Sequence, residues 1–302
     1  MPISPTPSFL IKVHYLAASV RRFGGALAAS PIIVTVGGDE SVDLTETQPW
    51  SRRLGVQWRW LDADLWRRHG IFATALQRFC YDIQTPTALL LDADTLFLAP
   101  IDDLLERIER TRAIAGLIAH LSPFLWSEAG QGLWREVFHA AGLGEPPMSC
   151  EHSGWQSIEH DAARRHCPPY FNLGVLLASR EALGALAKTI YSEMEAVERV
   201  IETPFRCQLA LTLAIQRARV PWEALPLRYN LPNDDRFLAR HGDEVGDVRV
   251  IHYLRDEEVS RSEDLASPEG IGELLAREDL HPINIRLRDA LRELHGGVLA
   301  AA

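Results

Sequence analysis

Apolar runs that suit buried strands alternate along this chain with stretches whose apolar residues recur at helical spacing. One such run is the β-branched stretch that follows Pro31 and ends in the turn residues Gly37 and Gly38. By the same criteria, strands are expected at residues 9–13, 56–61, 114–121, 170–179 and 249–254, a strand or loop end at 226–232, and an apolar stretch interrupted by a polar turn at 88–100.

Helices are expected between these strands. Gly24 and Gly25 stop a helix at residues 16–23, and Asp62 or Asp64 caps a helix that runs on to Phe79. Further helices are expected at residues 102–112, 181–200, 205–217 and 285–294. Because strand and helix alternate, the pattern predicts an α/β fold with a mixed, mainly parallel sheet, flanked by helices and wound with right-handed crossovers.

Two acids, Asp92 and Asp94, stand where the first apolar run of the 88–100 stretch stops. In an extended backbone, residues two apart point to the same side, so both carboxylates can face one point beyond the strand's carboxyl end. Open α/β sheets bind their ligands there. Two carboxylates this close repel each other unless a cation lies between them, which favours a divalent metal. The alternative is a turn without a ligand, because Asp is a common turn former.

Charge and composition narrow the class of function. The formal net charge is −10, and nucleic-acid backbones are bound by clustered Lys and Arg, so no nucleic-acid partner is expected. No window reaches the roughly 18 apolar residues of a membrane span, and the first residues lack the pattern of a signal peptide. The four cysteines lie far apart without a C-x-x-C pair, so we expect reduced thiols and a cytoplasmic location.

Residues 122–169 differ from the rest, because their periodicity is weak and they are rich in glycine and tryptophan. They predict a helix and a long irregular loop of the kind that covers a binding site. The strand that follows begins with Asn172 and Gly174, and a glycine there indicates close approach to the backbone. Gln208, near the start of a later helix, faces either a pocket or solvent. His252, among apolar neighbours, is either a core histidine or a ligand.

Taken in order, these motifs resemble the glycosyltransferases of the GT-A fold, nearest to the glycogenin-like and bacterial lipopolysaccharide galactosyltransferase-like family. The matching motifs are LLLDADTLFL for the family's DxD strand, YFNLGVLL for its FNxGV strand, CQLAL for its glutamine-bearing helix, RYN for its aromatic-Asn strand and IHYL for its late metal-binding histidine. The resemblance spans roughly residues 19–254.

The resemblance implies a single Rossmann-like GT-A domain over residues 1–302, with a lid-like insertion at about 122–169 and a C-terminal helical tail at about 256–302. It implies a metal-dependent transfer of a sugar, with retention at the anomeric carbon. The donor would be a nucleoside-diphosphate sugar, with a UDP-sugar as the first candidate. The acceptor would be a carbohydrate, a lipid-linked molecule or a protein.

The resemblance also implies roles for single residues. The metal, Mn²⁺ or else Mg²⁺, would be held by Asp92, Asp94 and His252, and the imidazole favours Mn²⁺. Gln208 would lie near the anomeric carbon, and Asn172 would position hydroxyl groups of donor or acceptor. Gly174 would border the donor sugar. Arg78 would reach the donor's phosphates or sugar, unless it makes only a surface ion pair.

Three features depart from the family pattern. The family's nucleotide-gripping loop is short here, with only His14 and Tyr15 to contribute. Cys207 replaces an acid that is common in the family before the helix glutamine. The chain also lacks the family's His-x-x-Gly-x-x-Lys arrangement after the late histidine, and the nearest basic residue is Arg255. Two alternatives stay open. One is a phosphatase of the haloacid dehalogenase type, which shares the DxD strand end but expects Thr or Val where this chain has Leu96. The other is a nucleotide-sugar-binding protein without turnover.

Overall fold

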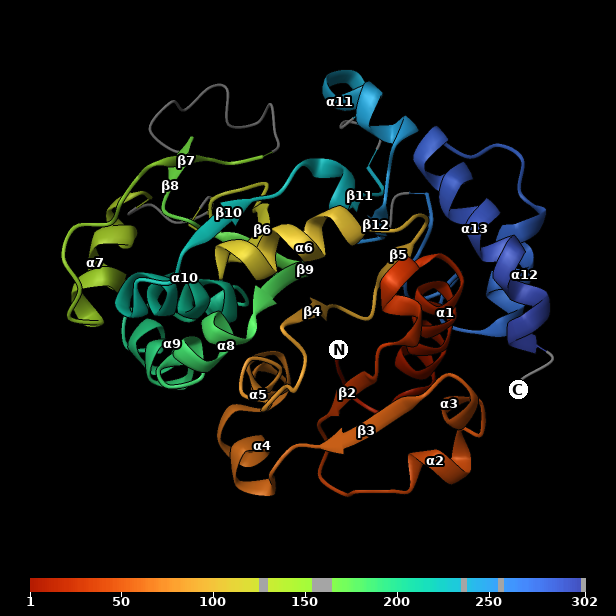
Figure 1. Ribbon diagram of the computed structural model, residues 1–302, viewed down its shortest axis with the longest axis horizontal. Coiled ribbons are helices and arrows are strands. Elements are labelled where there is room, and N and C mark those ends of the chain that lie inside the picture. The colour runs from red at the N-terminus through yellow and green to blue at the C-terminus, as the bar shows by residue number, and fades with distance from the viewer. Residues whose placement is uncertain (125–129, 154–164, 235–237, 255–257, 300–302) are drawn as a thin grey trace. The chain divides into compact units, whose positions relative to one another are not determined.

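The computed structural model describes residues 1–302 except 125–129, 154–164, 235–237, 255–257 and 300–302 (Figure 1). The chain forms two compact units: the first consists of Met1–Ala75, Leu91–Leu104 and Leu227–Ala302, and the second of Leu76–Leu90 and Leu105–Pro226. Helices accompany both parallel and antiparallel strand pairs, so the predicted α/β fold with mixed pairing is confirmed. The prediction of one domain with an insertion and a tail remains a proposal.

The first unit contains a parallel sheet in the order β1-β2-β3, which span Pro2–Ile3, Ile32–Val36 and Val56–Trp60. The β-branched residues of β2 suit its central place, because such side chains pack well on a pleated surface. Val34 and Val36 are fully buried there. The connections before and after β2 contain the short helices η1 (Gly25–Ala29), α2 (Leu44–Thr47) and α3 (Trp50–Arg53).

A second sheet of the first unit has the order β11-β12-β5, which span Leu231–Pro232, Val250–His252 and Thr95–Phe97. β12 pairs parallel with β11 and antiparallel with β5, so this small sheet is mixed. The neighbouring C-terminal segments form η4 (Leu227–Tyr229), α11 (Leu238–Gly246), α12 (Pro268–Ala276) and α13 (Pro282–Leu299). The expected helix at 285–294 is therefore confirmed, and α13 extends it at both ends.

Residues 9–13, which were expected to form a strand, belong to helix α1 (Pro7–Phe23). The strand prediction was therefore wrong. Thr6 caps the helix by accepting a hydrogen bond from the N–H of Phe9, and Pro7 stands in the first turn, where its missing N–H costs nothing. Apolar residues then recur three and four apart and are buried: Val13, Leu16, Ala17 and Val20. The helical period therefore continues through the β-prone stretch, and the sheet's first strand is β1 instead.

A second correction concerns the helix expected from Asp62 to Phe79. Asp62 caps a helix as predicted, but α4 (Ala63–His69) ends at Gly70, and α5 (Ile71–Gln77) starts anew. Gly70 has a φ of +56°, and a Cβ atom added to it would meet no other atom within 4 Å, so its backbone conformation alone favours glycine. The apolar spacing continues across this break, and periodicity therefore did not reveal it.

The second unit is built on a four-stranded sheet in the order β10-β6-β9-β4, which span Trp222–Ala224, Ile114–Ile118, Phe171–Ser179 and Thr87–Leu91. β6 pairs parallel with β10 and antiparallel with β9, with a register shift between Gly116 and Ile118. Every residue of β6 is buried, as expected of a strand covered on both faces. The strands predicted at 114–121 and 170–179 are thus confirmed, although β6 ends at Ile118.

The helices with most of their residues in the second unit are α6 (Asp102–Thr111), α7 (Gly132–Ala140), α8 (Arg180–Leu186), α9 (Ile190–Glu198) and α10 (Arg206–Ala218). The helix expected at 181–200 is two helices, because Thr189, with a φ of −131°, leaves the helical region between α8 and α9. None of the described helices has the length and apolarity needed to span a membrane.

The segment 122–169 contains the helix expected there, α7, and a pair of two-residue strands, β7 (Cys150–Glu151) and β8 (His166–Cys167). Residues 125–129 and 154–164 lie outside the described part of the chain. The lid function of this segment stays a prediction.

Candidate functional site

The two acids lie in the turn between β4 and β5, so the apolar run ends at Asp92 as predicted. Three hydrogen bonds hold this turn. The hydroxyl of Thr95 donates to the carbonyl of Asp92 at 2.9 Å, and the N–H of Tyr253 donates to the carbonyl of Asp94 at 3.0 Å. The buried hydroxyl of Tyr253 donates to the carbonyl of Ala93 at 3.2 Å. The residue after β12 therefore fixes the backbone that carries both acids.

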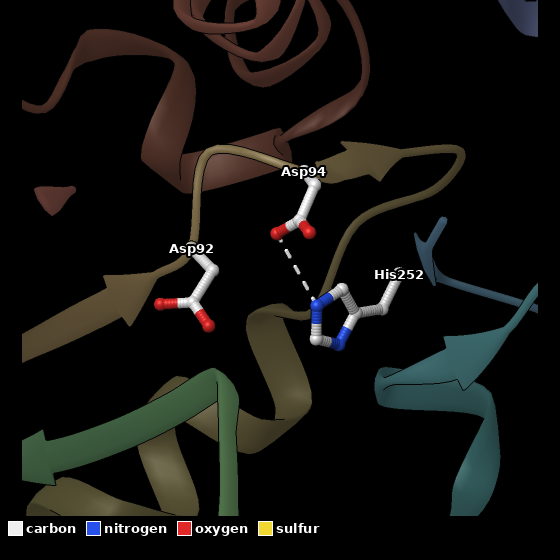
Figure 2. A group of neighbouring side chains, drawn as sticks. All are labelled: Asp92, Asp94 and His252. Atoms are coloured by element: carbon white, nitrogen blue, oxygen red, sulfur yellow. Dashed lines mark ion pairs between the residues drawn. The ribbon is translucent and has the colours of Figure 1, made fainter. Parts of the chain in front are cut away.

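His252 reaches the same place from β12. It lies opposite Thr95, the residue after Asp94, in the antiparallel pairing of β12 with β5. Its Nε2 is 3.3 Å from Oδ1 of Asp94, as Figure 2 shows, and its Nδ1 is 3.1 Å from Oδ1 of Asn230. Because an amide oxygen only accepts hydrogen bonds, Nδ1 carries a proton and Nε2 is the nitrogen that faces Asp94.

The side chains of Asp92, Asp94 and His252 fit a metal ion. One ligand atom from each lies within 4.8 Å of the others, and the three side chains face a common space in Figure 2. No other three His, Cys, Asp or Glu side chains among the described residues are arranged in this way. Two carboxylates and an imidazole suit Mn²⁺, because it binds nitrogen as well as oxygen. The predicted ligands thus come together, and their metal-binding role remains a proposal.

Arg261 is the second side chain that contacts Asp94. Its Nη1 is 3.0 Å from Oδ2, the carboxylate oxygen that does not face His252. Burial of Asp94 tends to raise its pKa, but the neighbouring His252 and Arg261 together outweigh burial and hold that pKa well below its usual range. Asp94 is therefore ionised at neutral pH, which is the form that binds a cation.

A pocket of about 430 Å³ opens beside Asp92 and Asp94. Its volume lies in the range of about 300–1,000 Å³ that is typical of small-molecule sites. Its wall includes Phe9 and Lys12 of α1 together with Arg261. The Nζ of Lys12 lies 5.4 Å from the ring centroid of Phe9. The pocket thus combines an aromatic ring and two cations with the two acids, all within the first unit.

His14 and Tyr15, expected to contribute to nucleotide binding, are buried in the middle of α1 instead. The ring of His14 stacks on Trp50 with centroids 4.2 Å apart, and the hydroxyl of Tyr15 lies 2.6 Å from Nδ1 of His295. Neither residue lines the pocket. The expectation fails because these residues belong to a helix, whose buried face packs against the rest of the first unit.

We expect His14 to make stability pH-dependent. Burial, with the nearby charge of Arg53, lowers its pKa from 6.5 to about 4. Between these values the unfolded chain binds the proton more readily, so the free energy of unfolding falls as pH drops from about 6.5 to 4, by up to about 3 kcal/mol. Denaturant unfolding of His14→Phe should show a flatter pH dependence in this window, after correction for its stability at pH 7.5. An unchanged slope would contradict this assignment.

Four further predicted residues belong to the second unit: Arg78, Asn172, Gly174 and Gln208. The side-chain oxygen of Asn172 accepts a hydrogen bond from the N–H of Gly174 at 2.8 Å, so the two form a local turn at the start of β9. Gln208 is half-buried in the first turn of α10. Arg78 is 3% exposed, which excludes a surface ion pair. Their catalytic and donor-binding roles stay predictions.

The sequence did not predict that two cationic residues and one amide take part in this site. Lys12 and Arg261 occur in segments without a motif, and only the pocket geometry identifies them. Asn230 was recognised as part of the RYN motif, but its partnership with His252 depends on the adjacent strands β11 and β12. Arg255, the nearest basic residue in sequence, lies outside the described residues.

Several solved glycosyltransferases resemble this chain in fold. The galactosyltransferase LgtC, in complex with donor and acceptor sugar analogues, matches with a TM-score of 0.53 and 16% identity over 97% of this chain and 94% of its own. GlyE of Streptococcus pneumoniae matches with a TM-score of 0.52 and 12% identity over 99% of this chain and 62% of its own. The bifunctional glycosyltransferase WbbM matches with a TM-score of 0.54 and 14% identity over all of this chain, which spans about half of WbbM (51%).

At these identities the similarity establishes the fold, which is that of the GT-A glycosyltransferases. No curated protein sequence matches the chain. A family model, the Rhodobacterales glycosyltransferase domain, matches residues 3–219, which include the turn with both acids. This match covers more than half of the chain, and it agrees with the family resemblance of the motifs. The chain therefore belongs to the Rhodobacterales glycosyltransferase domain family and is a glycosyltransferase.

Proposed function

We propose that this glycosyltransferase moves a sugar from a nucleoside-diphosphate sugar to a carbohydrate, lipid-linked or protein acceptor, with a divalent metal and with retention. The observation that supports it most is the cluster of two carboxylates and an imidazole at the edge of a pocket. The complex of LgtC with donor and acceptor sugar analogues supports the substrate class. A UDP-sugar is the first donor candidate.

The proposed metal ligands are Asp92, Asp94 and His252, and Mn²⁺ is preferred to Mg²⁺ because of the imidazole. When bound, the metal ion supplies positive charge that stabilises the departing nucleoside diphosphate. Asp94 offers its charged form at neutral pH, and Asn230 orients the ring of His252 through Nδ1. The site thus presents carboxylate oxygens and an oriented imidazole to a cation.

Positively charged side chains in the pocket can offset the negative charge of a bound diphosphate, although the protein as a whole is acidic. Lys12 and Arg261 both line the pocket that contains Asp92 and Asp94. We propose that they bind phosphate oxygens of the donor, in place of the basic residue that the family pattern expects after the late histidine. Arg261 neutralises Asp94 in this structure, and its guanidinium can turn to a phosphate when another cation takes that carboxylate.

In the second unit, we propose that Gln208 stabilises positive charge at the anomeric carbon and that Asn172 positions hydroxyl groups of donor or acceptor. Gly174 would border the donor sugar, where the lack of a side chain leaves room. The buried Arg78 would contact the donor's phosphates or sugar. These assignments rest on the motifs in which the residues stand.

Neither alternative is favoured by the family or the fold. A phosphatase of the haloacid dehalogenase type does not agree with the match to a glycosyltransferase family over residues 3–219. A binding protein without turnover is distinguished by measuring donor hydrolysis. The cytoplasm is the proposed location, because none of the four cysteines forms a disulfide in this structure and thiols persist in a reducing compartment.

Thermal unfolding with a panel of nucleoside diphosphates, with and without Mn²⁺, tests the proposed donor class. A ligand at a hundred times its dissociation constant adds about 2.7 kcal/mol, which raises the melting temperature by roughly 5 °C in a chain of this size. We expect such a rise for at least one nucleoside diphosphate, and only with Mn²⁺. Equal shifts in EDTA, or none with any nucleotide, would contradict the proposal.

The side-chain amide of Asn230 holds the ring of His252 in place, so its loss should weaken metal binding. Asn230→Ala removes the acceptor that orients His252, and loss of such an outer partner typically weakens metal binding about 10- to 100-fold. Asn230→Asp keeps an oxygen acceptor and should bind Mn²⁺ nearly as tightly as the wild type. Titration of Mn²⁺, with the free ion measured by electron paramagnetic resonance, separates the two variants. Equal affinities for Asn230→Ala and the wild type would remove His252 from the ligand set.

A further inference from the structure

Two cysteines face each other in the second unit. β7 and β8 pair antiparallel, and Cys150 is directly opposite Cys167. Opposite residues of an antiparallel pair have Cα atoms about 4.5–5.5 Å apart, with side chains on the same face. A disulfide needs Cα atoms about 4.4–6.8 Å apart. The backbone therefore already has the spacing of a disulfide, although both thiols are free in this structure.

Both thiols of the pair lie in the interior of the protein. Cys150 is 8% and Cys167 is 0% exposed, so the shared face is an interior one. Burial raises the pKa of Cys167, and the Cys150 thiolate raises it further, as expected of thiols that face each other across a strand pair. Among the described residues, no third metal-ligating side chain joins them, so the pair is not part of a metal site there.

We propose that Cys150 and Cys167 form a reversible disulfide, which makes this strand pair an oxidation site of the enzyme. The bond would close the chain between β7 and β8. β7 leads to His152, whose Nδ1 lies 2.9 Å from the carbonyl of Ala119 just after β6. β8 leads through Tyr170 into β9. The disulfide would therefore tie the ends of two central strands of the four-stranded sheet together, and so stabilise the start of β9.

The oxidant can be a small disulfide such as oxidised glutathione. The thiolate of Cys150, the more exposed of the two, attacks one sulfur of the oxidant, forming a mixed disulfide and releasing one glutathione thiolate. The thiolate of Cys167 then attacks the sulfur of Cys150, which forms the internal disulfide and releases the second glutathione. The two cysteine protons end on the two glutathione thiols. Burial raises the pKa of both cysteines, so the reaction should accelerate with pH above neutral.

The test uses the full chain, reduced and then incubated at pH 8 with oxidised glutathione. Remaining thiols are trapped with N-ethylmaleimide and the digest is analysed by mass spectrometry. We expect a peptide pair joined through Cys150 and Cys167, at least tenfold more abundant than any other pairing of the four cysteines. The same sample oxidised in guanidinium chloride should lose this preference, because the strands no longer align the thiols.

The competing pair is Cys80 with Cys207, since both interact with Tyr191. Cys80→Ser is therefore the matched control, and it should leave the Cys150–Cys167 peptide unchanged, whereas Cys167→Ser should abolish it. The oxidised wild type should also melt several degrees higher than the reduced form, and the difference should vanish after dithiothreitol. Native oxidation that joins other pairs equally well, or that leaves both thiols open to N-ethylmaleimide, would overturn the proposal.

Discussion

Asp94→Asn is expected to abolish Mn²⁺-dependent nucleotide binding and, with it, sugar transfer. Asp94 is the central member of the cluster, because its two oxygens face His252 at 3.3 Å and Arg261 at 3.0 Å. Asparagine keeps the shape but loses the negative charge that a divalent cation requires. We expect the affinity for Mn²⁺ to fall at least about a hundredfold, more than loss of an outer partner alone would cause. Calorimetric titration of Mn²⁺ in the presence of a nucleoside diphosphate measures this change.

The matched control is Asp64→Asn, which removes the same charge from an exposed position of α4. It should bind Mn²⁺ and nucleotide as the wild type does. Circular dichroism should show that Asp94→Asn remains folded, because the backbone of its turn is held by Thr95 and Tyr253 and not by the carboxylate. If Asp94→Asn and His252→Ala both keep wild-type metal affinity, the metal site has been assigned wrongly.

Gln208→Ala is expected to lower turnover by roughly a hundredfold or more, with little change in donor affinity. In a retaining transfer, positive charge develops at the anomeric carbon in the transition state. A neutral amide oxygen can stabilise this charge without competing for a proton. The interaction is weak in the ground state, so its loss should affect kcat much more than KM. Steady-state kinetics with the identified donor and acceptor measure both constants.

Gln216, exposed near the other end of α10, provides the matched control. Gln216→Ala changes the same kind of side chain on the same helix and should leave both constants unchanged. If Gln208→Ala keeps near-normal turnover, the side chain of Gln208 only caps or solvates the start of α10 and has no catalytic role. A product of inverted configuration would transfer the catalytic role to a carboxylate base.

The strands and acids of this fold could be predicted because local sequence determines them. The apolar run before Asp92 and the β-branched run of β2 both form strands at the expected places. The strand predicted at residues 9–13 was wrong, because β-prone residues also tolerate a helix once Thr6 and Pro7 have started it. The first strand, Pro2–Ile3, is too short for any periodicity to show.

The site could be predicted only where a motif carries it. Asp92, Asp94 and His252 come from motifs, and the structure brings them together. Arg261 and Lys12 do not, because their approach to the acids depends on how α1 and the segment after β12 pack in the first unit. Asn230 stood in a recognised motif, yet its contact with His252 follows from the pairing of β11 with β12.

Donor turnover is the direct test of a metal-dependent transfer from a nucleoside-diphosphate sugar. The protein is incubated with a panel of UDP-sugars and other nucleotide sugars, with Mn²⁺ or with EDTA, and the products are followed by ³¹P and ¹H nuclear magnetic resonance. We predict release of a nucleoside diphosphate and a sugar that initially keeps the donor's anomeric configuration, with Mn²⁺ only. Release of inorganic phosphate instead, or an unchanged rate in EDTA, would contradict the account.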